Sequence, residues 1–217
     1  RGVEIVSSGD LVQQFEAAWS ADQLASHEAA ARALYRIKDR AFHAAAAAVH
    51  EHSALTEYDL QQQMVGWFED EGLVSDSAPV VAVGANAGNP HYLPTADNCR
   101  GIVADKILLL VLWGKQTTSR AVFADITWVG VTGTMVPQKP ARAFSAIAKA
   151  RDAAVTLVEH AARTGRDLRG WEVDRAARTV LQDAGFGDYI LHRTGHSLGE
   201  SVHGNGVHLD DYETHDD

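Results

Sequence analysis

Apolar positions in the first part of the chain recur with the spacing of α-helices. Between Asp22 and His52 the sequence is rich in alanine and charged residues, with little glycine or proline. This pattern predicts one long helix that could contain a break. A second helix is predicted to begin at Thr56 and end near Gly72. Its apolar face is formed by Leu60, Met64, Trp67 and Phe68.

The middle of the chain alternates between short apolar runs and turn residues, which is typical of strands. Residues 78–83 form a first strand candidate, and a loop with several glycines and prolines follows as far as Pro94. Residues 107–113 are continuously apolar and predict a buried strand. A polar stretch separates them from residues 122–131, so these two segments predict a β-hairpin.

Helical spacing returns in the second half of the chain. Pro137 precedes a long helical pattern that is followed by Gly165, and a further helix is predicted from Trp171 to Ala184. From Tyr189 onward the sequence is rich in histidine and glycine, with short β-like pieces. Helices, strands, helices and strands in this order predict an α+β fold.

Composition and charge exclude several classes of partner. The 217 residues are 46% hydrophobic, which is enough for one sizeable core. The formal net charge of −10 argues against nucleic acid and anionic membranes as partners. The basic run Arg32–Arg40 is interpreted as the solvated face of a helix. No apolar run is long enough to span a membrane, and the single cysteine, Cys99, is interpreted as a passive thiol in a cytoplasmic protein.

A cluster of histidines near the end of the chain is the densest chemical signal. Four of them, His192, His196, His203 and His208, fall within seventeen residues. Neutral imidazole is a common metal ligand and the usual proton shuttle near pH 7. The glycines at 195 and 199 disfavour a helical zinc pair and indicate tight turns that place imidazoles in a cleft.

Two further residues stand in unusual surroundings. Asp125 lies inside the apolar run 122–131, where a carboxylate requires a cation, hydrogen bonds or an exposed edge. His91 follows Pro90 in the loop after the first strand candidate. Taken alone, His91 is more typical of a structural or exposed loop residue than of a catalytic one.

These pieces occur in an order that resembles the pita-bread metallopeptidases, most closely their Xaa-Pro aminopeptidase and prolidase branch. The resemblance rests on three motifs and covers the chain from about Asp22 to the end. The motifs are Gly84-x-Asn86 with Pro90-His91-Tyr92, then Asp125-Ile126-Thr127, then Gly195-His196-Ser197-Leu198-Gly199 with His203. The resemblance implies an α+β pita-bread fold and hydrolysis of a peptide bond by metal-activated water.

The resemblance also implies a role for each matching residue. Asp125 corresponds to the aspartate that bridges two divalent ions, and His196 corresponds to the single histidine ligand. His91 and His203 correspond to the histidines that hold the substrate and stabilise the tetrahedral intermediate. The implied cofactor is a pair of Mn, Co or Zn ions, and the implied substrate is a peptide with proline after the cleaved bond. A homodimer is compatible with the sequence.

The chain departs from the family pattern at the first strand of the hairpin. Val111 stands where the family has an aspartate ligand, and Asp105 belongs to the preceding turn. The family's two glutamate ligands follow the His196 region, and neither Glu200 nor Glu213 has the expected strand context. Of the implied ligands, Asp125 and His196 are present, so we expect this chain to be inactive and to bind metal weakly.

These departures leave three interpretations of the function open. The first is a metallopeptidase domain that is truncated at its C-terminus, occupying residues 21–217 after a linker or domain tail at residues 1–20. The second is a non-catalytic pita-bread module that binds peptides or proteins. The third is a creatinase-like hydrolase that cleaves a non-peptide C–N bond with histidines and no metal. The fold alone does not choose among them.

Overall fold

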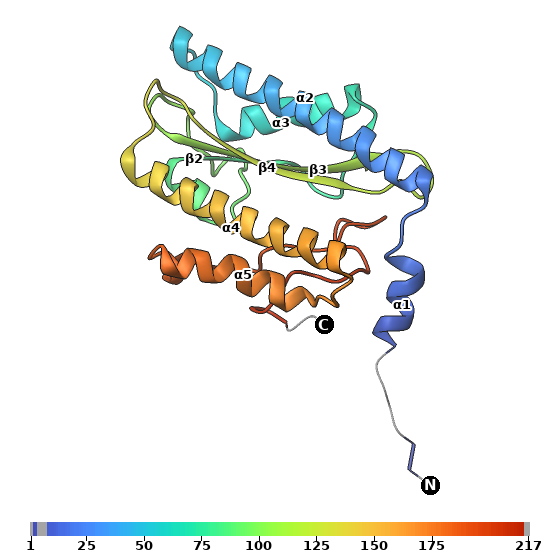
Figure 1. Cartoon of the computed structure of the whole chain (residues 1–217). Coiled ribbons are helices and arrows are strands. Elements are labelled where there is room, and N and C mark those ends of the chain that lie inside the picture. The colour runs from blue at the N-terminus through green and yellow to red at the C-terminus, as the bar shows by residue number, and fades with distance from the viewer. Residues whose placement is uncertain (1, 4–7, 215–217) are drawn as a thin grey trace. The chain divides into compact units, whose positions relative to one another are not determined.

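The computed structural model describes residues 2–3 and 8–214, which form two compact units (Figure 1). One unit consists of Ser20–Val136 with Glu200–Val202. The other consists of Arg1–Trp19, Pro137–Gly199 and His203–Asp217. The boundary expected between residues 20 and 21 stays a prediction.

Two capped helices begin the first unit. Helix α2 (Ala21–Glu51) is unbroken, and α3 (Glu57–Asp70) follows it. Each starts with a capping box. The side chains of Ser20 and Thr56 accept a hydrogen bond from the backbone N–H of the third helical residue, and the side chain of that residue accepts the backbone N–H of Ser20 or Thr56 in turn. Both predicted helices are therefore confirmed, and the local sequence explains where each begins.

An antiparallel sheet completes this unit. Strand β3 (Ile107–Gln116) pairs with β4 (Ala124–Val131) on one side, and with β2 (Val80–Val83) and the short β1 (Leu73–Val74) on the other. The predicted hairpin is confirmed, although β3 extends as far as Gln116, into the polar stretch that was expected to form the turn. Strand β1 has no counterpart among the predicted strands, because two residues are too few to show a period.

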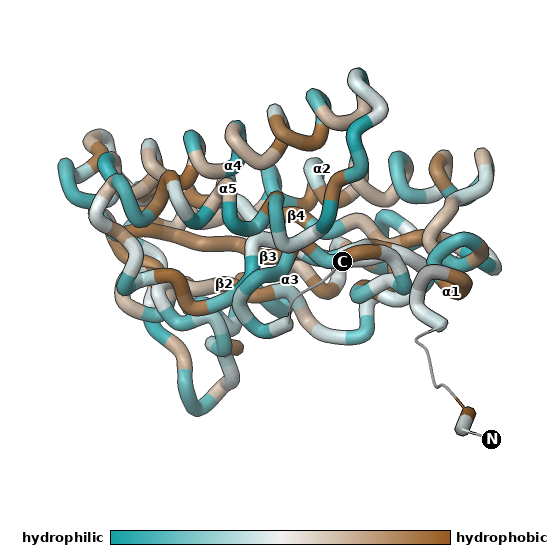
Figure 2. The backbone as a smooth tube through the Cα atoms, turned by 60° about the horizontal axis from the view of Figure 1, so that its bottom comes forward, coloured by the Kyte–Doolittle hydropathy of each residue, from teal (hydrophilic) through white to brown (hydrophobic). Residues whose placement is uncertain are grey.

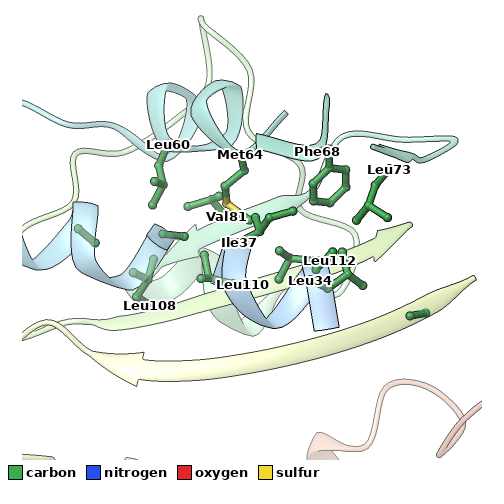
Figure 3. Packing of buried hydrophobic residues seen from close by; sticks show 14 of the residues in the cluster. Leu34, Ile37, Leu60, Met64, Phe68, Leu73, Val81, Leu108, Leu110 and Leu112 are labelled. Carbon is green, nitrogen blue, oxygen red and sulfur yellow. The ribbon is translucent and has the colours of Figure 1, made fainter. Parts of the chain in front are cut away.

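The two faces of the sheet differ because successive strand residues point to opposite sides. Leu108, Leu110 and Leu112 are fully buried and pack in one core with residues of α2 and α3 (Figure 3). The labelled partners in that core are Leu34, Ile37, Leu60, Met64, Phe68, Leu73 and Val81. The intervening residues of β3, among them Val111, lie on the opposite face.

The basic run on α2 is only partly solvated. Arg32, Arg36 and Arg40 are exposed, whereas Lys38 is buried. The Lys38 ammonium lies 4.4 Å from the ring centroid of Trp128 and forms an ion pair with Asp39 at 2.7 Å. The interpretation as a solvated face is thus wrong for Lys38, whose aliphatic stem covers apolar surface.

The second unit is mainly helical. It contains α1 (Gly9–Glu16), α4 (Gln138–Thr164) and α5 (Gly170–Asp183). Hydrophilic and hydrophobic residues alternate along α4 in Figure 2, as expected for an amphipathic helix. Its buried residues Ala150 and Ala154 pack with Val173 and Ala177 of α5. No described helix is long and apolar enough to cross a bilayer.

The histidine-rich segment after residue 189 does not form the short strands that the sequence suggested. In its described part, up to residue 214, it contains a single isolated bridge between Gly195 and Leu209. Several of its backbone N–H groups donate to the buried carboxylates of Asp174 and Asp210. These side-chain acceptors replace the partner strand that a β-ladder would need.

Candidate functional site

The β3–β4 register determines which side chains accompany Asp125. Asp125 pairs with Trp113, and Val111 pairs with Thr127. Paired residues of an antiparallel sheet share a face, so Asp125 and Val111 are diagonal neighbours on the same side. Such neighbours lie about 7–8 Å apart in antiparallel pairs. The position where the resemblance implies a second aspartate is therefore close to Asp125.

This face of the hairpin offers few groups that could hold a cation. Asp125 is the only carboxylate among the described β3 and β4 residues that point to this side. Thr127 adds a hydroxyl, and the others are Ile107, Leu109, Val111, Trp113, Lys115, Val129 and Val131, of which Lys115 would repel a cation. Hard divalent ions prefer several oxygen or imidazole ligands, so this surface by itself is a poor cation site.

His91 is exposed on a loop that a buried carboxylate anchors. The loop begins with a 3₁₀ helix, Gly84–Gly88, and Glu57 lies below it with no exposed surface. The carboxylate of Glu57 accepts hydrogen bonds from the amide of Asn86, the hydroxyl of Tyr92 and the N–H of Arg100. Burial and then the bond to Glu57 raise the pKa of Tyr92 well above its ordinary value, so the phenol remains a donor.

His196 and His203 lie together in the second unit. Their ring centroids are 4.4 Å apart in an edge-to-face arrangement, with an interplanar angle of 75°. The Nδ1 atom of His196 is 3.0 Å from the carbonyl oxygen of Ser197. A carbonyl can only accept, so the proton of neutral His196 is on Nδ1 and its lone pair is on Nε2. This tautomer is suited to binding a metal ion through Nε2.

The backbone around His196 is held by its neighbours. Ser197 donates its N–H to Nδ1 of His208 at 3.0 Å and accepts a bond from Gly204 at 2.8 Å. Gly195 and Leu209 exchange two backbone hydrogen bonds of 3.1 and 3.3 Å. Residues 195–209 therefore form a closed loop whose conformation fixes the His196 ring.

Two buried carboxylates anchor this loop. Asp174 on α5 accepts hydrogen bonds from Arg178, from the N–H of Thr194 and from the N–H of Asp211. Asp210 accepts N–H bonds from the three residues that begin at Tyr212. Burial would raise the pKa of Asp210, but these bonds lower it to about 2. Asp210 thus holds its part of the loop in its charged form, and Asp174 anchors the loop through its hydrogen bonds to Thr194 and Asp211.

The four residues singled out from the sequence fall into two groups. Asp125 and His91 belong to the unit built on the sheet, and His196 and His203 belong to the helical unit. The structure brings His196 and His203 together, and the convergence of all four on one cleft stays a prediction. Within each unit, the described residues include no group of three or more histidine, cysteine or acidic side chains able to hold a metal ion.

Sequence reasoning missed the carboxylates that support these residues. Glu57 occupies the first turn of α3, where an acidic residue is ordinarily exposed and stabilised by the helix dipole. Asp174 lies in the middle of α5, and Asp210 lies in an irregular segment. No local signal distinguishes Glu57 and Asp174, because their hydrogen-bond donors include residues distant in the chain, whereas the N–H donors of Asp210 are residues that follow it closely.

Comparison with known proteins identifies the relationship. Residues 29–216 match the model of metallopeptidase family M24. The chain is 29% identical over 150 residues to a putative Xaa-Pro aminopeptidase of Mycoplasma genitalium, covering 69% of this chain and 39% of that protein. It is also 29% identical over 163 residues to an Xaa-Pro dipeptidase of Lactobacillus helveticus, covering 75% of this chain and 39% of that protein.

Solved structures show the same fold. Dipeptidase PepE from Mycobacterium ulcerans superposes with a TM-score of 0.75 at 24% identity, over 96% of this chain and 52% of that one. An X-Pro aminopeptidase from Thermotoga maritima gives a TM-score of 0.70 at 18% identity, over 91% and 52% of the two chains. The chain thus spans about half the length of these structures.

The fold comparison agrees with the arrangement of helices and sheet described above and confirms the predicted α+β pita-bread fold. The family match covers most of the chain and includes Asp125, His91, His196 and His203. This chain belongs to metallopeptidase family M24, a family of divalent-metal peptidases.

Proposed function

We propose that this chain is a peptide-recognising domain of the M24 family in which the loss of one metal ligand disables metal-dependent hydrolysis. The observation that carries the proposal is the register of the β3–β4 hairpin, which puts Val111 beside Asp125 on one face. A valine there supplies no oxygen to a cation and puts an apolar group where charge would have to be stabilised.

The donor set of the chain does not fit a centre of two divalent ions. Asp125 contributes one carboxylate, and His196 has the tautomer of a ligand through Nε2. A catalytic metal usually needs three protein ligands, and two ions need more. The proposed consequence is weak binding of Mn, Co or Zn, with no route to hydroxide formation through the chain's own residues.

Peptide recognition is proposed to use His91 and His203. Both are exposed and both come from irregular segments, so their imidazoles can reach a ligand. A neutral imidazole donates one hydrogen bond and accepts another, which suits the carbonyl and N–H groups of a peptide. The relatives named as Xaa-Pro dipeptidase and Xaa-Pro aminopeptidase support a short peptide with proline after the first residue.

The creatinase-like alternative is favoured by the same valine. Chemistry that uses His91, His196 and His203 without a metal would not require a carboxylate at position 111. The two functions differ in one observable property, because the alternative predicts hydrolysis by the unmodified protein in the presence of a chelator.

The test compares the unmodified chain with Val111→Asp. Bound Mn, Co and Zn are measured by elemental analysis after dialysis, and hydrolysis of Ala-Pro and of creatine, a substrate with a non-peptide C–N bond, is followed with and without chelator. We expect the aspartate to raise the metal content of the chain, because it adds a carboxylate beside Asp125 on the same face.

Two control variants separate charge from position. Val111→Asn gives a similar shape with no charge, and Leu109→Asp puts a carboxylate on the same face one pair farther from Asp125. Neither is expected to raise the metal content. Tight binding of two ions by the unmodified protein, or activity that resists the chelator, would contradict the proposal.

A further inference from the structure

A buried carboxylate that the proposed function does not use lies beneath the His91 loop. Glu57 has no exposed surface, and its Oε1 accepts the N–H of Val83 at 2.5 Å. Its Oε2 accepts the Tyr92 hydroxyl at 2.5 Å and the N–H of Arg100 at 2.7 Å. Asn86 donates to both oxygens at 3.0 and 3.1 Å. These donors are uncharged backbone N–H, amide and hydroxyl groups, so hydrogen bonds satisfy the buried carboxyl group.

Two chains of hydrogen bonds lead from Glu57 to His91. On one side, Tyr92 directly follows His91 and is bonded to the carboxylate through its hydroxyl. On the other side, the side-chain amide of Asn86 donates to Glu57, and the backbone carbonyl of Asn86 accepts the N–H of Asn89 at 3.0 Å. The side chain of Asn89 then accepts the N–H of His91 at 3.0 Å. The backbone of His91 is therefore fixed on both sides.

We propose that Glu57 is a positioning residue that holds His91 in the orientation needed to bind a peptide. The inference rests on the role proposed above for His91. An exposed loop rich in glycine would otherwise lose conformational freedom on binding, and that cost lowers affinity. The hydrogen bonds to Glu57 order the loop when the protein folds, so this entropy is not lost again when a peptide binds.

Replacement by glutamine gives a sharp perturbation with almost no change in shape. The donors of Val83 and Arg100 face different oxygens of Glu57. Glutamine has a single oxygen, so its NH₂ group must face one of these two backbone N–H groups. We expect hydrogen exchange at one of the two amides to accelerate by about tenfold or more. We also expect the ring signals of His91 in NMR spectra to shift or split.

A double-mutant cycle tests whether Glu57 acts through His91. Affinity for Ala-Pro is measured by titration calorimetry for Glu57→Gln, His91→Ala and the double variant. We expect His91→Ala to weaken binding by about tenfold and Glu57→Gln to produce most of that loss. The double variant should bind no more weakly than His91→Ala. Leu60→Ala, at a buried position of the same helix, controls for general loss of stability and should leave affinity unchanged.

The outcomes separate this inference from the proposed function. If His91→Ala leaves affinity unchanged, the recognition role of His91 is wrong, and the NMR signals of His91 then decide whether Glu57 positions it. Unchanged His91 signals in Glu57→Gln would overturn the inference. The same conclusion follows if Glu57→Gln weakens binding equally with and without His91, because the effect would then not pass through that residue.

Discussion

The acid sensitivity of Asp210 provides a quantitative test of the turn that closes the His196 loop. Asp210 is fully buried and accepts N–H bonds of 2.8, 2.8 and 3.1 Å from Tyr212, Glu213 and Thr214. The hydroxyl of Thr214 adds a bond of 2.9 Å. Burial opposes ionisation, but these donors lower the pKa of Asp210 from 3.8 to about 2. The charged form is therefore favoured by folding.

The direction and size of the effect follow from this difference. The pKa of Asp210 is lower in the folded state, so its contribution to stability is fully present above about pH 4 and is lost as the pH falls through about 2. The interval between 3.8 and about 2, at about 1.4 kcal/mol for each pKa unit, corresponds to about 2–3 kcal/mol. We expect Asp210→Asn to lower the free energy of unfolding by up to this amount at pH 7.

The assay is urea unfolding at pH 7, 5, 4 and 3, followed through the backbone amide signals of Gly195 and Leu209. These two residues pair with each other and report on this loop. Asp183→Asn, at an exposed carboxylate at the end of α5, serves as the control and should change stability little at any pH. The difference between wild type and Asp210→Asn should shrink steadily below pH 4. An equal difference at pH 7 and pH 3 would refute the electrostatic explanation.

Two further predictions concern the unit built on the sheet. Tyr92→Phe removes one hydrogen bond to the Glu57 carboxylate and should cost about 2 kcal/mol in urea unfolding at pH 7. Because folding raises the pKa of Tyr92, that contribution should be lost as the pH rises above about 10, so the two proteins should converge in stability at alkaline pH. Leu110→Ala removes a fully buried side chain and should cost about 2–5 kcal/mol, whereas Val155→Ala at a half-exposed position should cost far less. A Leu110→Ala protein as stable as wild type would show that the core of Figure 3 is assigned wrongly.

Much of the secondary structure could be predicted because its signals are local. The alanine-rich run from Asp22 is sufficient to predict α2, and Thr56 marks the start of α3. The apolar run from Ile107 predicts β3, but the strand continues beyond the predicted end at Trp113 as far as Gln116. Lys115 and Gln116 are polar residues that continue the strand because β1 pairs with them. Tertiary pairing thus overrides composition at that end.

The candidate site shows the same division between local and long-range information. Asp125, His91, His196 and His203 could be selected from motifs, because a few residues of sequence carry each resemblance. Their arrangement in space could not be predicted from the sequence. Which residues share a face of the sheet depends on the β3–β4 register, and the conformation of each loop depends on the buried carboxylate that binds it. The sequence identifies Val111 as a departure from the family pattern, but only its pairing with Thr127 shows that it shares a face with Asp125.

The sequence by itself determined the family, the helices, the hairpin and the residue types that carry chemistry. All of these depend on neighbours close in the chain, where spacing and capping are directly visible. Tertiary structure alone decided that Glu57, Asp174 and Asp210 are buried and which distant N–H groups Glu57 and Asp174 hold. The donors that satisfy Glu57 come from residues 83–100, at least 26 positions away. A carboxylate can be buried only where such donors converge, and that convergence is a property of the folded chain.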